Sequence, residues 1–134
     1  MHHVRCASWP RQGFYIGEVG IIKAIPKKLL IHTVMQTRKG KADRWGNETP
    51  GTAQELRYVR MEPTTKVVRD KNSAEIQLAA TLFYDCRNSR PHGVTFAVGD
   101  IITFNGQKHQ VKIVEPLYDG ERLHHYELGL IAYA

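Results

Sequence analysis

Histidine and cysteine side chains are the residues of this sequence best suited to hold a metal ion. They are Cys86, His92, His109, His124 and His125. Thiolate and imidazole ligands suit zinc, but zinc sites use short, regular ligand spacings that this set lacks. His124 and His125 are neighbours in a predicted strand, where consecutive side chains point to opposite faces. We therefore expect that they do not bind one ion together, and we predict neither a metal site nor a cofactor.

Carboxylates are the second group that could do chemistry. They are Asp85, Asp100, Glu115, Asp119 and Glu127. Hydrolysis by a carboxylate pair needs two such groups close together, whereas Asp100 and Asp119 each adjoin a glycine and are explained as turn residues. The motifs of phosphate-binding loops, dinucleotide sites, zinc proteases and nucleophile elbows are missing. We expect a protein without catalytic residues.

Basic residues cluster along the sequence in the predicted strand at residues 54–61 and in the loop that follows it. They are Arg57, Arg60, Lys66, Arg69 and Lys71. Such a cluster either forms a solvated face or lies near a phosphate backbone. Only Tyr58 is interleaved with these charges, and this argues against a module that stacks single-stranded bases.

Residues 98–130 predict a three-stranded meander, the clearest structural pattern in the chain. Asn105 and Gly106 suit a type I′ turn, because both accept positive φ angles. Asp119 and Gly120 predict the second turn. His109, Val111 and Ile113 alternate with polar residues and are expected on one face, while Pro116 is expected to end its strand because it lacks an N–H.

Four further segments have the composition or alternation of strands: residues 29–37, 54–61, 75–85 and 94–98. A short strand is also suggested at residues 14–16. Loops are predicted at residues 38–52 and at residues 63–74. Trp45 in the first loop is either a lid on the core, which is the commoner position of a large aromatic residue, or an exposed anchor. The sequence predicts six or seven antiparallel strands and no helix. The edges of such a sheet must be protected, and closure of the sheet into a barrel protects them. The predicted fold is all-β, a small antiparallel β-barrel with a long inter-strand loop and an extended N-terminal arm.

Length and composition fit a single globular domain. The chain has 134 residues, 42% of them hydrophobic and 24% charged, and a formal net charge of +6. We expect an arm over residues 1–24 and the barrel over residues 25–134. Cys6 and Cys86 are expected as free thiols, and neither a signal peptide nor a membrane-spanning stretch is recognised. These features indicate an intracellular protein, and the positive charge permits a nucleic-acid partner.

Several long stretches resemble the minor capsid protein family of tailed phages, whose members are small head–tail connector or stopper proteins that complete the head. The matching stretches are IPKKLLIH (25–32), DRWG (43–46), EPTTKVVRDKN (62–72), LFYD (82–85), NSRP (88–91), VEPLYDG (114–120) and LHHYE (123–127). Residues 1–24 lie outside the resemblance.

The resemblance implies a structural protein of the virion that is made and assembled in the bacterial host cytoplasm. It implies a homo-oligomeric ring below the portal or an adaptor ring, with tail proteins on the other side and packaged double-stranded DNA in the lumen. In related stoppers, a long loop between strands projects into the channel and retains DNA. Here that loop would be residues 63–75, with Pro63, Lys66, Arg69, Asp70, Lys71, Asn72 and Glu75 as its channel residues.

Two other readings of the sequence remain open at this point. A stand-alone nucleic-acid-binding barrel of the SH3-like or OB type agrees with the charge and the fold, and salt-sensitive DNA binding by a monomer would favour it. A small metal-dependent hydrolase would require stoichiometric, tightly bound zinc. The ring protein is the preferred interpretation because of the long family-like stretches.

Overall fold

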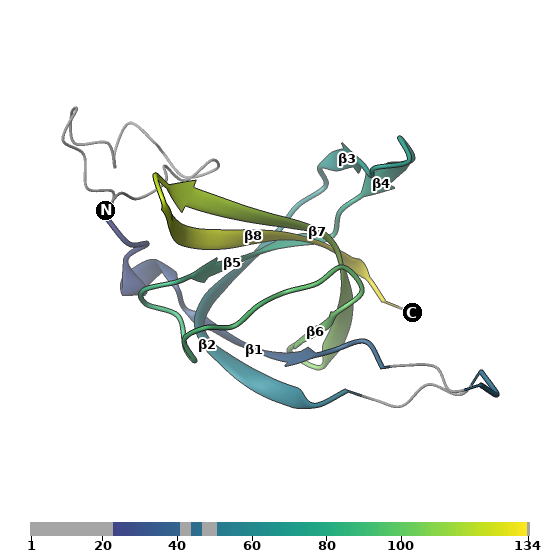
Figure 1. Ribbon diagram of the computed structural model, residues 1–134, viewed down its shortest axis with the longest axis horizontal. Helices are drawn as coiled ribbons and strands as arrows, with labels where there is room; N and C mark the ends of the chain where they lie inside the picture. Colours follow the sequence, from purple (N-terminus) through teal and green to yellow (C-terminus); the bar gives the residue numbers. More distant parts are fainter. Residues whose placement is uncertain (1–22, 41–43, 47–50, 134) are drawn as a thin grey trace.

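The computed structural model describes residues 23–40, 44–46 and 51–133 (Figure 1). The strand suggested at residues 14–16, and residues 1–22 of the predicted arm, lie outside the described residues. In the part of the chain that is described, no helix has the length and hydrophobicity needed to cross a bilayer.

Six strands close into an antiparallel barrel, in the order β1-β2-β5-β8-β7-β6. Their bounds are β1 (His32–Thr37), β2 (Ala53–Pro63), β5 (Ala80–Asp85), β6 (Ile101–Phe104), β7 (Gln107–Asp119) and β8 (Arg122–Ala132). Two short strands, β3 (Val67–Arg69) and β4 (Glu75–Gln77), form a separate two-stranded sheet, and a 3-10 turn, η2 (Lys27–Leu29), precedes β1. The prediction of a small all-β antiparallel barrel is confirmed.

The barrel interior is filled by the inward-facing side chains of all six strands and of the segment before β6. The rings of Tyr84, Phe96 and Tyr126 pack against one another with centroids 5.1–6.3 Å apart, and Phe96 meets both tyrosines edge-on. The fully buried members include Leu56, Val59, Leu82, Ile102, Val111, Leu128 and Leu130. Because the interior is packed with apolar side chains, any binding function belongs to the outer surface and the projections.

Three sequence expectations about strand limits are wrong. Residues 75–85 form two strands, because the chain leaves the β3–β4 sheet at Leu78 and enters the barrel at Ala80. Residues 94–98 form no strand, although Val94 and Phe96 are buried in the core and Val98 is exposed. Pro116 does not end its strand but pairs with Tyr126. β6 pairs with β7 only up to Gln110, so Pro116 lies where β7 is an edge and no ladder partner needs its N–H.

A β-bulge changes the face that β7 presents to the core. Val111 pairs with Leu130 and Ile113 pairs with Gly129, so Lys112 is an extra residue. The extra residue reverses the alternation. Val114, rather than Ile113, therefore packs against the core after the bulge, and the expectation that His109, Val111 and Ile113 share one face is wrong.

The two hairpins of the meander turn close to the predicted positions. Asn105 and Gly106 occupy the turn between β6 and β7 with φ angles of 51° and 78°. At the second turn Asp119 pairs with Arg122, so Gly120 and the residue after it form the loop. Gly120 has a φ of 61°, in the region that favours glycine.

The segment before β1 is fastened to the outside of the barrel by an apolar cluster and a buried carboxylate. Ile25 and Leu30 pack on Phe83 of β5. Asp85, which is fully buried, accepts hydrogen bonds from three backbone N–H groups, those of Ile25 (3.1 Å), Arg87 (3.0 Å) and Asn88 (2.7 Å). One carboxylate thus joins the entry segment to the turn that follows β5.

Replacement of Asp85 by alanine should destabilise the protein by about 3 kcal/mol or more, because several buried N–H groups would lose their acceptor. Asp70→Ala is the matched control, since Asp70 also accepts two backbone N–H groups but does so in solvent. It should cost about 1 kcal/mol. Urea unfolding measures both, and equal losses for the two variants would contradict the assigned role of Asp85.

Candidate functional site

The segment predicted as a long loop over residues 63–75 is a β-hairpin that projects from the barrel (Figure 1). β3 pairs with β4 in the register Val67↔Gln77 to Arg69↔Glu75. The turn depends on Asp70, whose Oδ1 accepts the N–H groups of Asn72 (2.8 Å) and Ala74 (2.9 Å). Sequence reasoning missed the hairpin because three-residue strands of mixed charge show no clear alternation.

The charges of the hairpin are partly paired within it. Arg69 forms a salt bridge with Glu75 at 3.2 Å and donates to the Ser73 carbonyl at 3.0 Å. In contrast, no salt bridge within the described part of the chain involves Lys66 or Lys71. Both lysines are exposed, so they are the two cations of the hairpin that are available to an external anion.

The root of the hairpin is rigidly attached to β8. Ala79 N–H donates to the Leu130 carbonyl at 2.8 Å, and Leu78 N–H donates to the Lys66 carbonyl at 2.9 Å. The buried Leu78 side chain lies directly on Gly129, where an added Cβ would come within 3.0 Å of it. Glycine at this point allows Leu78 to pack closely on β8, and a larger residue would require the Leu78 side chain to move by a few tenths of an ångström.

The other basic residues of the predicted cluster have carboxylate neighbours on β2. Arg60 binds Glu62 at 2.9 Å, and Arg57 lies 3.9 Å from Glu55. The structure therefore does not unite the five predicted basic residues in one patch. Trp45 is 73% exposed, so the expectation that it covers the core is wrong, and its ring instead lies under the Arg44 guanidinium at 4.9 Å.

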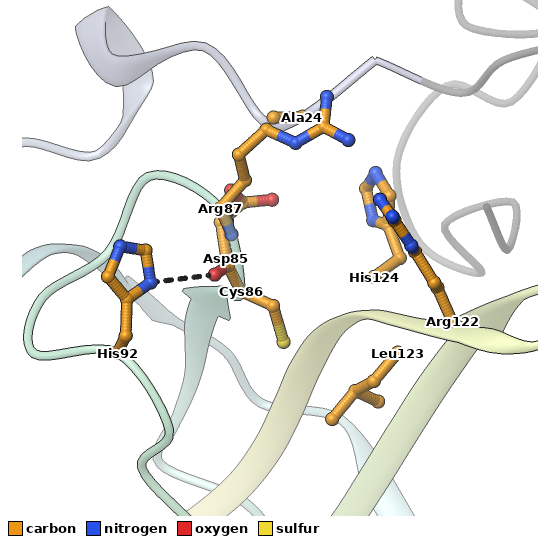
Figure 2. Close-up of a pocket in the computed structure, with 8 residues that line it drawn as sticks. All are labelled: Ala24, Asp85, Cys86, Arg87, His92, Arg122, Leu123 and His124. Atoms are coloured by element: carbon orange, nitrogen blue, oxygen red, sulfur yellow. Dashed lines mark hydrogen bonds between the residues drawn. The ribbon is translucent and has the colours of Figure 1, made fainter. Parts of the chain in front are cut away.

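Three of the predicted metal-ligand candidates line one cavity of about 280 Å³ (Figure 2). Cys86, His92 and His124 surround it, and His92 Nδ1 lies 3.3 Å from the Cys86 carbonyl. Among the described residues, no three His, Cys, Asp or Glu side chains are placed to hold a metal ion. Burial, reinforced by the nearby Asp85 charge, raises the pKa of the Cys86 thiol to about 12. The thiol is therefore protonated near neutral pH and is a poor ligand and nucleophile.

His124 and His125 contact each other, and the expectation that they point to opposite sides of the strand is wrong. Their Nδ1 atoms are 3.0 Å apart. Leu117 pairs with His125 and Tyr118 pairs with Leu123, so His124 is the extra residue of a β-bulge. A bulge breaks the alternation on which the expectation depended.

The two imidazoles form part of a buried hydrogen-bonded chain. His124 Nε2 lies 2.8 Å from the Lys23 carbonyl, which only accepts, so this nitrogen carries a proton. When His124 is neutral, its Nδ1 accepts from His125, whose Nε2 lies 2.9 Å from Glu127 Oε2. Burial is the main cause that lowers the pKa of His124. This series of hydrogen bonds fastens residue 23 to β8. It lies next to the hydrogen bond by which Asp85 holds the backbone of Ile25, and its role is structural.

Three other carboxylates proposed from the sequence, those of Asp100, Glu115 and Glu127, lie in different surroundings. Asp100 is buried and accepts from Gln36 Nε2 and the Ala97 N–H, each at 3.0 Å. Glu115 and Glu127 are register partners on β7 and β8, but Glu127 is buried against His125 and Glu115 is exposed. Neither carboxylate is arranged with a second one around a cavity.

Comparison with known proteins identifies the family of the chain. The family model described as minor capsid protein matches residues 26–130. The chain belongs to this family. Membership makes it a structural protein of a virion, in agreement with the resemblance of its long sequence stretches, and no curated protein sequence matches it.

The solved structures that resemble this chain include that of the phage-like element PBSX protein xkdH from Bacillus subtilis. The two chains share 13% sequence identity, and the similarity covers 75% of this chain and 92% of that one with a TM-score of 0.39.

The free energy of unfolding of this minor capsid protein should fall as the pH drops below 6.5. His124 has a lowered pKa in the folded state, so the unfolded chain binds a proton first. Protonated His124 would also direct a second N–H at His125. His124→Gln should reduce this pH dependence between about pH 7 and pH 5. His92→Gln is the control, because His92 lines the same cavity but is exposed. Urea unfolding at each pH measures the effect, and identical pH dependence in all three proteins would contradict it.

Proposed function

We propose that this protein forms a homo-oligomeric ring at the neck of a tailed phage or prophage particle. The ring extends the DNA channel below the portal or an adaptor ring, joins the head to the tail proteins and helps to retain packaged double-stranded DNA. Assembly takes place in the bacterial host cytoplasm. The role is mechanical and electrostatic, with no catalytic turnover. Family membership supports the virion role, and the projecting hairpin supports the channel role.

The β3–β4 hairpin is the single observation that carries the stopper role. The six barrel strands use their edges in closure, whereas β3 and β4 stand outside the barrel as a separate sheet (Figure 1). A two-stranded hairpin of this size is only marginally stable by itself. Its ordered turn and its fixed root on β8 keep it extended, as an element that reaches into a channel needs to be.

The charge of the hairpin suits temporary contact with DNA. Lys66, Arg69 and Lys71 are positive and Asp70 and Glu75 are negative, which gives three minus two, or a net charge of +1. The Arg69–Glu75 salt bridge and the turn role of Asp70 leave Lys66 and Lys71 for phosphate groups. A few cations give salt-dependent attraction, and a larger number would hold DNA during ejection.

A ring requires that each subunit present two different surfaces that fit each other. Closed rings form when this head-to-tail contact repeats by rotation. The closed barrel provides a rigid body for such contacts. The hairpin root is bonded to β8, the strand that lies between β5 and β7. In our proposal the face that carries the hairpin points inward, so the hairpins of all subunits would converge on the axis of the ring.

Shortening the hairpin should release DNA from filled heads without preventing assembly. Residues 68–76 are replaced by Asn-Gly, a two-residue turn that fits the paired ends Val67 and Gln77. The root contacts of Leu78 and Ala79 are retained. Particles carrying this variant should contain the ring but should lose DNA when the tail is absent, as measured by nuclease-accessible DNA.

A second variant tests the effect of the hairpin's charge separately from the effect of its length. Lys66→Gln with Lys71→Gln keeps the hairpin and removes its two unpaired cations. It should retain DNA better than the shortened variant, and its DNA retention should depend less on salt than that of the unaltered protein, because the two cations that attract phosphate groups are gone. Normal DNA retention by particles with the shortened hairpin would show that the hairpin is not the gate.

A further inference from the structure

A basic groove lies on the outer surface across β1, β6 and β7, beside the C-terminal end of β8. Its volume is about 450 Å³. Arg38, Lys39 and Lys108 supply three cations, and Thr37, Thr103 and Gln110 add neutral hydrogen-bonding groups. No carboxylate is among the described residues that line the groove. This composition is suited to an anion with several oxygen atoms.

Two of the three cations are not neutralised by neighbours. Arg38 is held from behind by the buried Asp100 at 3.4 Å and by Thr95, which accepts from its guanidinium at 2.7 and 3.0 Å. Within the described ranges, Lys39 and Lys108 form no salt bridge. The groove therefore contains an oriented guanidinium and two uncompensated ammonium groups.

The position of Lys39 depends on a glycine. Gly99 has a φ of +100°, and an added Cβ would lie 3.2 Å from Lys39 Cδ. The Lys39 stem thus passes close to the backbone at Gly99. The backbone of Lys108, which also lines the groove, is fixed to the end of β8, because its carbonyl accepts the Tyr133 N–H at 3.1 Å.

The groove lies close to the β3–β4 hairpin along β8. The hairpin root bonds to Leu130, and Tyr133 at the groove is three residues further, about 10 Å along the chain. Figure 1 shows the hairpin, the C-terminus and the end of β1 on the same side of the barrel. The groove that Lys39 and Lys108 line is thus adjacent to the part of β8 that holds the hairpin root.

We infer that this groove binds a phosphodiester group of double-stranded DNA, next to the phosphates that the hairpin contacts. The inference rests on the proposed channel function and adds a second, separate contact to it. The repeating phosphates of a duplex match cations spread over two neighbouring sites, whereas a free phosphate ion would occupy the groove alone. Guanidinium and ammonium donors are the groups that most often bind the DNA backbone.

The test is the affinity of the full chain for a short DNA duplex, measured by fluorescence anisotropy over a range of salt concentrations. Lys39→Ala with Lys108→Ala should weaken binding about tenfold and should reduce the slope of log affinity against log salt by about 2. The control is Lys23→Ala with Lys28→Ala, which removes the same charge from two exposed residues near η2. It should change the slope much less. A parallel NMR titration with inorganic phosphate reports whether free phosphate also occupies the groove.

Three outcomes would overturn the inference. They are equal effects of the groove and control variants, phosphate binding in the groove with unchanged duplex affinity in the groove variant, and no salt-sensitive duplex binding by the unaltered chain. If only the hairpin variant Lys66→Gln with Lys71→Gln weakens duplex binding, the groove is excluded and the channel function stands. The ring itself is judged by its location in the particle, which does not depend on the groove.

Discussion

Strand β8 is hydrogen-bonded along both of its edges, and every functional feature of the protein depends on this double pairing. β5 pairs with one edge in the register Ala80↔Leu130 to Asp85↔His125, and β7 pairs with the other. At one end of β8 the histidine chain holds the entry segment. Near the other end Leu130 binds the hairpin root, and Tyr133 beyond it borders the basic groove. A strand fixed on both sides cannot slip, so these features keep constant relative positions.

The ability of the protein surface to attract an anion depends on which basic side chains are already paired with carboxylates. Salt bridges to nearby carboxylates involve four arginines: Arg38, which pairs with Asp100, and Arg57, Arg60 and Arg69. Within the described ranges, the lysines of the hairpin and of the groove form no salt bridge, so their charges are available to an external polyanion. In the proposed channel function, this distribution would let a chain with a net charge of +6 contact DNA without binding it too tightly for ejection.

The strand alternation and turn residues were sufficient to predict the closed all-β barrel, and the long family stretches were sufficient to predict the minor capsid family. The errors have physical causes. Extra residues at Lys112 and His124 shift the alternation by one, and no local sequence rule indicates a bulge. Pro116 is tolerated because its strand edge is free. The groove could not be predicted, since it joins Lys39, Gly99, Lys108 and Tyr133 from four separate segments.

We propose that this chain forms a ring at the neck, with its hairpins directed toward the axis. The measurement to make is an image reconstruction of particles that contain this chain. We expect a ring of density between the capsid vertex and the tail that fits copies of the barrel, with residues 63–79 reaching toward the channel. If particles shown to contain the chain have no such density at the neck, the ring is excluded and a stand-alone nucleic-acid-binding barrel is favoured.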